Sequence, residues 1–368
     1  MADSIDKSVT DTKTTVEIPG AEEIIQDQQE KIEKVQSDGG PVEIEMDDQG
    51  GAEISFDPNA VTPEGGEEHF SNLAEFLDDG LLTELATTLS DKYTSYKESR
   101  ADWEDSYREG LDLLGFKYQR RTQPFRGASS VTHPVLAEAV AQFQATAYKE
   151  LLPADGPVRA QILGAVTSAK QDQANRVKDF MNYQLMDQMK EYEPEFDQML
   201  FYLPLTGSTF KKVYYDDLLG RAVSKFVHSD DLVVPYSATS LEDAEAVVHV
   251  IKMSENELRK QQVSGFYKDI DLGEPPVVEN QLTEKKQELE GITQNGQEDM
   301  YTLLEFHIDL DLEGYEDVNP EDGEPTGIKV PYIVTVDTAN TEILSIRRNY
   351  QAEDPLKKKI NYFVQFKF

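Results

Sequence analysis

Residues 208–217, STFKKVYYDD, mark the point where the chain changes from helical to strand-like patterning. The stretch alternates and is rich in β-branched and aromatic residues, which is typical of a strand. Leu219-Gly220 predicts a turn, and residues 221–229, RAVSKFVHS, predict the second arm of a hairpin. We therefore expect an α+β fold in which a helical region, residues 70–207, leads into a β-rich region, residues 208–368.

Upstream of this stretch, apolar residues recur at the spacing of a helix. Pro134 and Pro194 suit the first turns of helices, while Gly115, Leu152-Pro153 and Gly207 suit helix ends. The predicted helical segments are 80–114, 134–152, 168–190 and 194–207.

Downstream, strands are predicted at 231–236, 245–253, 301–312, 332–350 and 361–368. The segment 332–350 is expected to be a hairpin that turns near residues 338–340. Ser254 and Glu257 have the spacing of a capping box, which predicts a short helix after the second of these strands. Residues 271–298 are polar and are expected to form a mobile loop. Because the chain stops in mid-pattern at Phe368, we expect a truncated product or fragment.

The N-terminal residues 1–69 are acidic and carry Phe56 as their only Phe, Tyr or Trp. Up to Asp79 there are 22 acidic residues and 4 lysines, a net charge of −18 and half of the whole excess. Low hydrophobicity with high charge cannot offset the entropy of ordering, so we expect a disordered tail. Residues 21–36 could instead form a helix when a partner binds.

The whole chain has a formal net charge of −36 and contains no cysteine. This charge argues against a surface built to grip phosphates, because affinity for nucleic acid comes largely from Lys and Arg. Disulfides, thiolate metal sites and cysteine nucleophiles are excluded. Neither a signal peptide nor a run of about 20 apolar residues is present, so we expect a soluble intracellular protein with no membrane partner.

Enzyme motifs give no support for catalysis. The five histidines are scattered and none forms a metal-binding pair, so each is expected to pack or to form hydrogen bonds. Gly291 and Gly296 have phosphate-loop spacing, but Gln297 stands where the lysine belongs. The acidic run at 309–313 imitates a calcium loop, but Pro320 occupies the position of the bidentate carboxylate. We expect no catalytic, cofactor-binding or metal-binding residues.

One basic cluster stands out in this acidic chain: Lys117, Arg120, Arg121 and Arg126. It could be a solvated face. Alternatively, its arginines could contact acidic groups of another subunit or DNA phosphates, because the guanidinium group forms bidentate contacts with both.

Two stretches carry a resemblance to a known family. Residues 125–134, FRGASSVTHP, run into VLAEAVAQFQATAYKELLP and look like the start of the wing region of portal proteins of tailed bacteriophages. Residues 207–216, GSTFKKVYYD, are followed by HSDDLVVPYSATSLEDAEAVVHVIKMSENEL, whose order resembles the hairpin, short strand and capped helix of that family. The resemblance covers 80–265 well and 300–368 loosely.

The resemblance implies a homo-oligomeric ring, usually of twelve copies, at one capsid vertex of the virion, assembled in the host cytoplasm. Such a ring conducts double-stranded genome DNA non-specifically, docks the terminase packaging motor, and contacts capsid and tail-adaptor proteins. Family members continue with stem, clip and crown parts, before which this chain ends. An acidic conduit fits this role, because it repels phosphates over the ~8 Å Debye length and lets DNA slide.

Two other classes of function stay open. An acidic scaffold or decoration protein of a virion would bind a partner through the tail, and would be a monomer with that partner rather than a ring. A nuclease or hydrolase could assemble its site from scattered carboxylates, and would show metal-dependent turnover.

Overall fold

The computed structural model describes residues 43–46, 52–55, 69–114, 125, 127, 133–216, 219–275, 300–318, 324–352 and 354–368. The chain divides into two compact units, residues 1–68 and residues 69–368. Within the first, two short strands pair antiparallel: β1 (Glu43–Met46) and β2 (Ala52–Ser55). Apart from these two strands and His69, the segment 1–69, for which disorder is predicted, lies outside the described residues.

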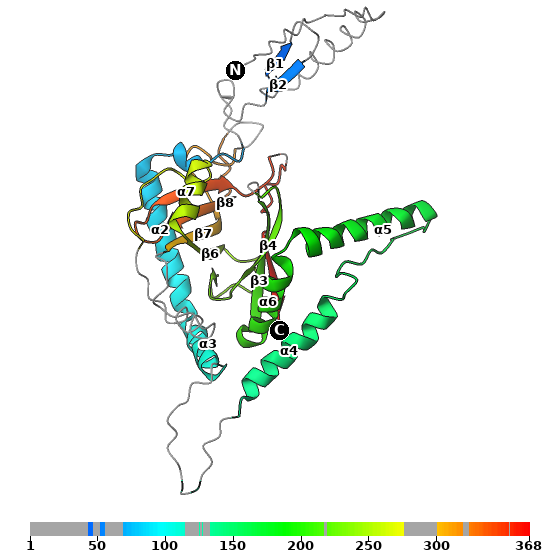
Figure 1. The fold of residues 1–368 in the computed structure, drawn as a ribbon. Coiled ribbons are helices and arrows are strands. Elements are labelled where there is room, and N and C mark those ends of the chain that lie inside the picture. Colours follow the sequence, from blue (N-terminus) through cyan, green and yellow to red (C-terminus); the bar gives the residue numbers. More distant parts are fainter. Residues whose placement is uncertain are drawn as a thin grey trace, which may run out of the picture. The chain divides into compact units, whose positions relative to one another are not determined.

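The larger sheet of the second unit has five strands, all antiparallel, in the order β5-β6-β7-β8-β9 (Figure 1). The strands are β5 (Leu232–Val233), β6 (Ala246–Met253), β7 (Tyr301–Leu310), β8 (Val330–Asp337) and β9 (Ile343–Arg348). The predicted strands and the 332–350 hairpin are confirmed, except that β5 covers only two of the six residues expected at 231–236.

Helices cover both faces of this sheet. On one face, Leu304, Phe306 and Ile308 of β7 join a core with α2 (Asp79–Ser99). On the other face, Leu303 packs with Leu258 of α7 (Glu255–Val263). This alternation follows from the two-residue period of a strand. The predicted capping box at Ser254 and Glu257 is confirmed as the start of α7.

The edge strand β9 is covered by the segment that precedes α2. Asn72 caps the short helix η1 (Leu73–Glu75). Its side-chain nitrogen donates to the Leu344 carbonyl at 3.0 Å, and its side-chain oxygen accepts from the Ile346 amide at 2.9 Å. One buried amide side chain thus replaces a neighbouring strand, which protects an otherwise exposed sheet edge.

The smaller sheet has three antiparallel strands in the order β10-β3-β4. They are β3 (Ser208–Asp216), β4 (Arg221–Val227) and β10 (Phe363–Lys367), so the hairpin predicted from residues 208–229 and the strand predicted at the C-terminus are confirmed. Helix α6 (Tyr192–Thr206) packs on this sheet and ends at Gly207, whose backbone is left-handed. Pro194 lies in the first turn of α6, as expected, but Pro204 lies within the helix.

Three helical predictions need correction. Segment 80–114 is two helices, α2 and α3 (Ala101–Leu114), separated by Arg100, whose backbone leaves the helical region. The helix predicted at 134–152 is α4 (Val135–Leu151), with Pro134 as its cap rather than its first residue. The helix predicted at 168–190 is α5 (Ser168–Tyr183), followed by a π-helical turn, η2 (Gln184–Gln188).

The hydrophobic cores combine residues from before and after position 208, where helices give way to strands. Leu82, Ala86 and Leu89 of α2 belong to the core of the five-stranded sheet. Tyr107 of α3 packs with Tyr202 of α6. Helix α2 is thus part of the core of the five-stranded sheet, while α3 and α4 pack on α6.

Candidate functional site

The basic cluster predicted as a contact site lies outside the described residues. This holds for all four members: Lys117, Arg120, Arg121 and Arg126. Its role as a subunit or DNA contact stays a prediction.

Two of the histidines make the contacts expected of packing residues. The His69 ring lies 2.9 Å from the Tyr350 carbonyl, and His228 packs between the rings of Tyr202 and Phe226. The other two buried histidines come together instead of remaining isolated. His249 of β6 and His307 of β7 both face Glu305 of β7.

The Glu305 cluster, defined as Glu305, Lys212, His249 and His307, joins the two sheets. The Nζ atom of Lys212, on β3, lies 2.6 and 2.7 Å from the two carboxylate oxygens of Glu305. His307 Nε2 lies 2.8 Å from Oε1 of the same carboxylate, and His249 Nδ1 lies 3.7 Å from it. The side chains of Glu305 and Lys212 are only 12% and 15% exposed, so this ion pair is shielded from water.

Charge and burial shift the pKa values of this cluster in a consistent direction. Burial by itself would raise the pKa of Glu305, but the charge of Lys212 and the contacts of the His249 and His307 rings hold it well below the usual 4.5. Burial lowers the pKa of His249 and of His307 below the usual 6.5, against the opposing effect of Glu305. The folded cluster therefore holds neutral histidines beside a charged carboxylate.

We expect acid to destabilise the fold in two stages. Below pH 6.5 the unfolded chain binds protons on His249 and His307 that the folded chain resists, so stability, complete above 6.5, falls as pH drops toward the lowered values. Below pH 4.5 the contribution of charged Glu305 is lost as well. Each unit of depression corresponds to about 1.4 kcal/mol. Urea unfolding at several pH values between 8 and 4, on the wild type and on His307→Gln, measures this slope; the exposed His133→Gln is the control. If the free energy of unfolding falls as steeply between pH 6.5 and 5 in His307→Gln as in the wild type, His307 is not a source of the acid sensitivity.

A second buried lysine lies on the opposite face of the same strand. Lys211 is 3% exposed, and its Nζ lies 4.2 Å from the ring centre of Tyr192 and 5.4 Å from that of Phe196, both on α6. Burial lowers its pKa to about 8, although Glu195 and Glu191 oppose the shift. The two consecutive lysines thus face α6 on one side and the five-stranded sheet on the other. Each lysine therefore packs between elements of the fold.

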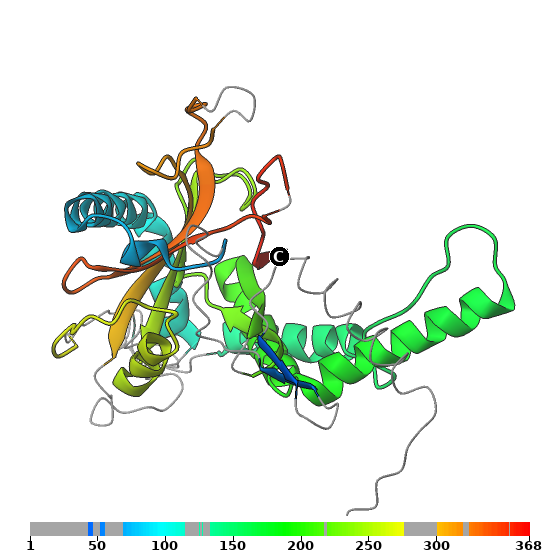
Figure 2. The ribbon, with the colours of Figure 1, turned by 90° about the horizontal axis from the view of Figure 1, so that it is seen from above.

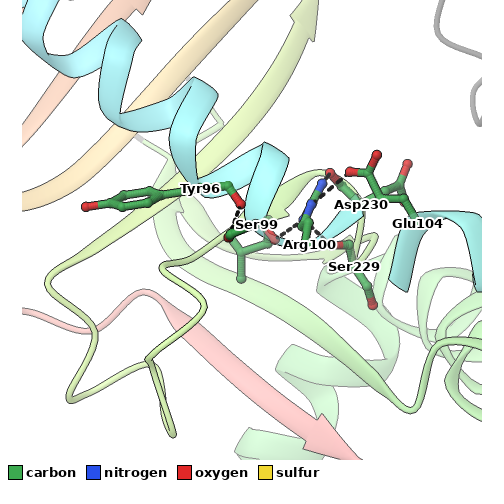
Figure 3. Close-up of polar contacts among 7 residues, drawn as sticks. Tyr96, Ser99, Arg100, Glu104, Ser229 and Asp230 are labelled. Carbon is green, nitrogen blue, oxygen red and sulfur yellow. Dashed lines mark hydrogen bonds and ion pairs between the residues drawn. The ribbon is translucent and has the colours of Figure 1, made fainter. Parts of the chain in front are cut away.

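Arg100, the residue that separates α2 from α3, holds the segment that follows β4 (Figure 3). Its guanidinium donates to the carbonyls of Ser229 at 3.2 Å and Asp230 at 2.6 Å, and to that of Leu232 at 3.0 Å. Its Nε donates to Glu104 at 2.9 Å. The planar, five-donor guanidinium suits this arrangement, and a lysine could not reproduce it.

The cavity next to Arg100 has a volume of about 180 Å³ and no histidine, aspartate or glutamate in its lining. Among the described residues, no group of three or more His, Asp or Glu side chains is placed to hold a metal ion. In the same part of the chain, no helix combines the length and the apolar character that crossing a membrane requires. The lining of the cavity next to Arg100 therefore offers no carboxylate or imidazole for acid–base chemistry.

The most unusual surface is on α5. Among the described α-helices it alone buries no residue, although its sequence is amphipathic. Val177, Phe180 and Met181 are 50%, 57% and 43% exposed and fall on one face at 100° per residue; we call them the α5 stripe. In Figure 2, α5 runs out from the strands with no sheet along it. Clustered exposed apolar residues mark interaction sites in folded proteins.

Sequence reasoning found the α5 stripe as a helix face but assigned it no role, and it missed the Glu305 cluster. The signal for the stripe was a helical apolar pattern between two loops. The signal for the cluster was the pair Lys211-Lys212 inside a strand, because adjacent strand residues face opposite sides and both sides here are covered.

Comparison with known proteins gives no identification: no family model and no curated protein matches the chain.

Proposed function

We propose that this chain is a structural subunit of a ring at the portal vertex of a tailed phage, a conduit for genome DNA and a platform for the packaging motor and tail. The observation that carries the proposal is the exposed α5 stripe, because clustered exposed apolar residues mark interaction sites in folded proteins. The order of elements from α4 through the β3–β4 hairpin to α7 supports it through the family resemblance.

The site chemistry is compatible with this role. The buried charged groups of the Glu305 cluster and of Arg100 connect the two sheets and hold the segment that follows β4, and the cavity beside Arg100 has no histidine, aspartate or glutamate in its lining. A subunit that must resist the force of DNA passage is stabilised by these buried polar contacts, because they break only when the packed elements separate.

Native mass spectrometry of the chain tests the proposal. We expect assemblies whose mass is a multiple of the subunit mass and high enough for a ring. A chain that stays monomeric at all concentrations, and binds a partner through its acidic N-terminal region, would favour the scaffold or decoration alternative instead.

We expect the protein to bind free duplex DNA weakly. Non-specific affinity rises with the number of phosphates that Lys and Arg neutralise, and the formal net charge of −36 opposes many such contacts. A titration of random-sequence duplex DNA at physiological salt should give a dissociation constant above about 1 µM, and weaker binding as salt increases. Sub-micromolar binding would mean that the protein grips DNA, and the conduit role would have to be withdrawn.

A further inference from the structure

An apolar groove lies between α2 and the loop that follows β7. Its floor and walls are Leu77, Leu81, Leu82, Leu85, Thr88 and Leu312, and its other lining residues are Glu84, Asp311 and Glu313. We call this set the α2 groove. Its volume is about 310 Å³, at the lower end of the ~300–1,000 Å³ found for ligand pockets. Leu81 in its wall is 36% exposed, and the acidic side chains at its border are exposed as well.

The α5 stripe has the opposite charge at its borders. At 100° per residue, Arg176 and Lys178 flank the stripe on its two sides. The acidic residues of the helix, Asp172 and Asp179, fall on the opposite face. An apolar ridge with basic flanks and an apolar groove with acidic borders are therefore present on the same chain.

We propose that the α5 stripe of one copy docks into the α2 groove of the next copy. The contact is heterologous, since each copy presents its stripe to one neighbour and its groove to the other, and such contacts generate rings when the rotation closes. The inference rests on the proposed ring and names its interface. Phe180 is the anchor, because a central aromatic side chain in an apolar pocket supplies most of the binding energy at an interface.

Charge favours the α2 groove of a second copy over two other partners for the α5 stripe, namely the same stripe of a second copy and a membrane. A stripe that packed against the same stripe of a second copy would bring Arg176 and Lys178 against their own counterparts, which is unfavourable. A membrane surface would attract the basic flanks, but anionic lipid would repel a chain with a net charge of −36. The acidic border of the α2 groove attracts the same flanks.

The absence of cysteine from the chain allows a direct test by disulfide trapping. Phe180→Cys and Leu81→Cys chains, distinguished by a size tag, are mixed and oxidised, and products are separated without reductant. We expect a disulfide-linked heterodimer in the mixture and little product from either variant alone. A chain with both substitutions should give a ladder of linked subunits. Val263→Cys, an aliphatic position on α7 that is 76% exposed, replaces Leu81→Cys as the matched control.

Three results would overturn the inference. They are linkage of Phe180→Cys chains to each other, equal linkage to Val263→Cys, and no linkage at all. If wild type still forms large assemblies by native mass spectrometry, only the interface is wrong; if it is monomeric, the ring is wrong too.

Charge reversal gives an independent readout. Arg176→Glu with Lys178→Glu should weaken self-association on the order of tenfold, and Glu84→Lys with Glu313→Lys in the partner copy should restore it. Failure of this rescue counts against the pairing. Sedimentation with vesicles of equal parts phosphatidylcholine and phosphatidylserine tests the membrane reading. If the wild type binds the vesicles and the Arg176→Glu, Lys178→Glu variant does not, the inference is overturned.

Discussion

Replacing Glu305 by glutamine is expected to lower the free energy of unfolding by about 3–5 kcal/mol. Glutamine retains the shape of the side chain and an oxygen for His307, but it leaves the Lys212 ammonium without a counter-charge at a position that is 15% exposed. An uncompensated charge in such a place costs far more than the intact pair contributes. Urea unfolding at pH 7.5 measures the difference.

The double variant Lys212→Met, Glu305→Gln is the control that separates charge from packing. Removing both charges should return the stability to within about 1.5 kcal/mol of wild type, because neutral groups of similar size often replace a buried ion pair at little cost. Lys212→Met alone completes the comparison. If the loss of stability in the double variant equals the sum of the losses in Glu305→Gln and Lys212→Met, the two residues are not coupled, and the account of the Glu305 cluster fails.

Replacing Arg100 by methionine is expected to destabilise the chain by about 2–4 kcal/mol. Methionine fills the space of the aliphatic stem, but the carbonyls of Ser229, Asp230 and Leu232 lose their donor, and each buried acceptor left unpaired costs roughly 1–3 kcal/mol before water partly replaces the bond. Arg100→Lys should fall between wild type and Arg100→Met, since the ammonium keeps the charge but not the fork of donors.

Arg108→Met is the matched control, on the same helix pair. Arg108 pairs with Asp105 one turn away, and the Asp105 side chain is 68% exposed, so its loss should cost less than about 1 kcal/mol. Equal losses for Arg100→Met and Arg108→Met would show that the bonds to the 229–232 segment contribute nothing beyond ordinary surface charge.

Much of the fold could be predicted from residue periodicity. The hairpin around Leu219-Gly220 and the capping box at Ser254 depend on local spacing alone, and both are confirmed. Periodicity could not show that Arg100 interrupts the segment 80–114, because the interruption follows from long-range bonds to residues 229–232 that no local pattern contains. It also could not show that α2 packs on strands more than 140 residues away.

The candidate sites likewise combine features that local sequence shows with features that depend on long-range contacts. The amphipathic character of α5 is visible in the sequence, but whether its stripe is buried depends on what the rest of the chain covers. The Glu305 cluster brings together residues 212, 249, 305 and 307 from three strands of two sheets, and only their pairing places them side by side. The basic cluster around Arg120 was the predicted contact site and still awaits a test.

Electron microscopy of the purified full chain tests the central claim most directly. Class averages of the largest assembly should show a closed ring of identical subunits around a central channel, and the Phe180→Glu variant should show far fewer such rings. Particles without rotational symmetry, or a population of monomers and compact dimers at every concentration, would contradict the account.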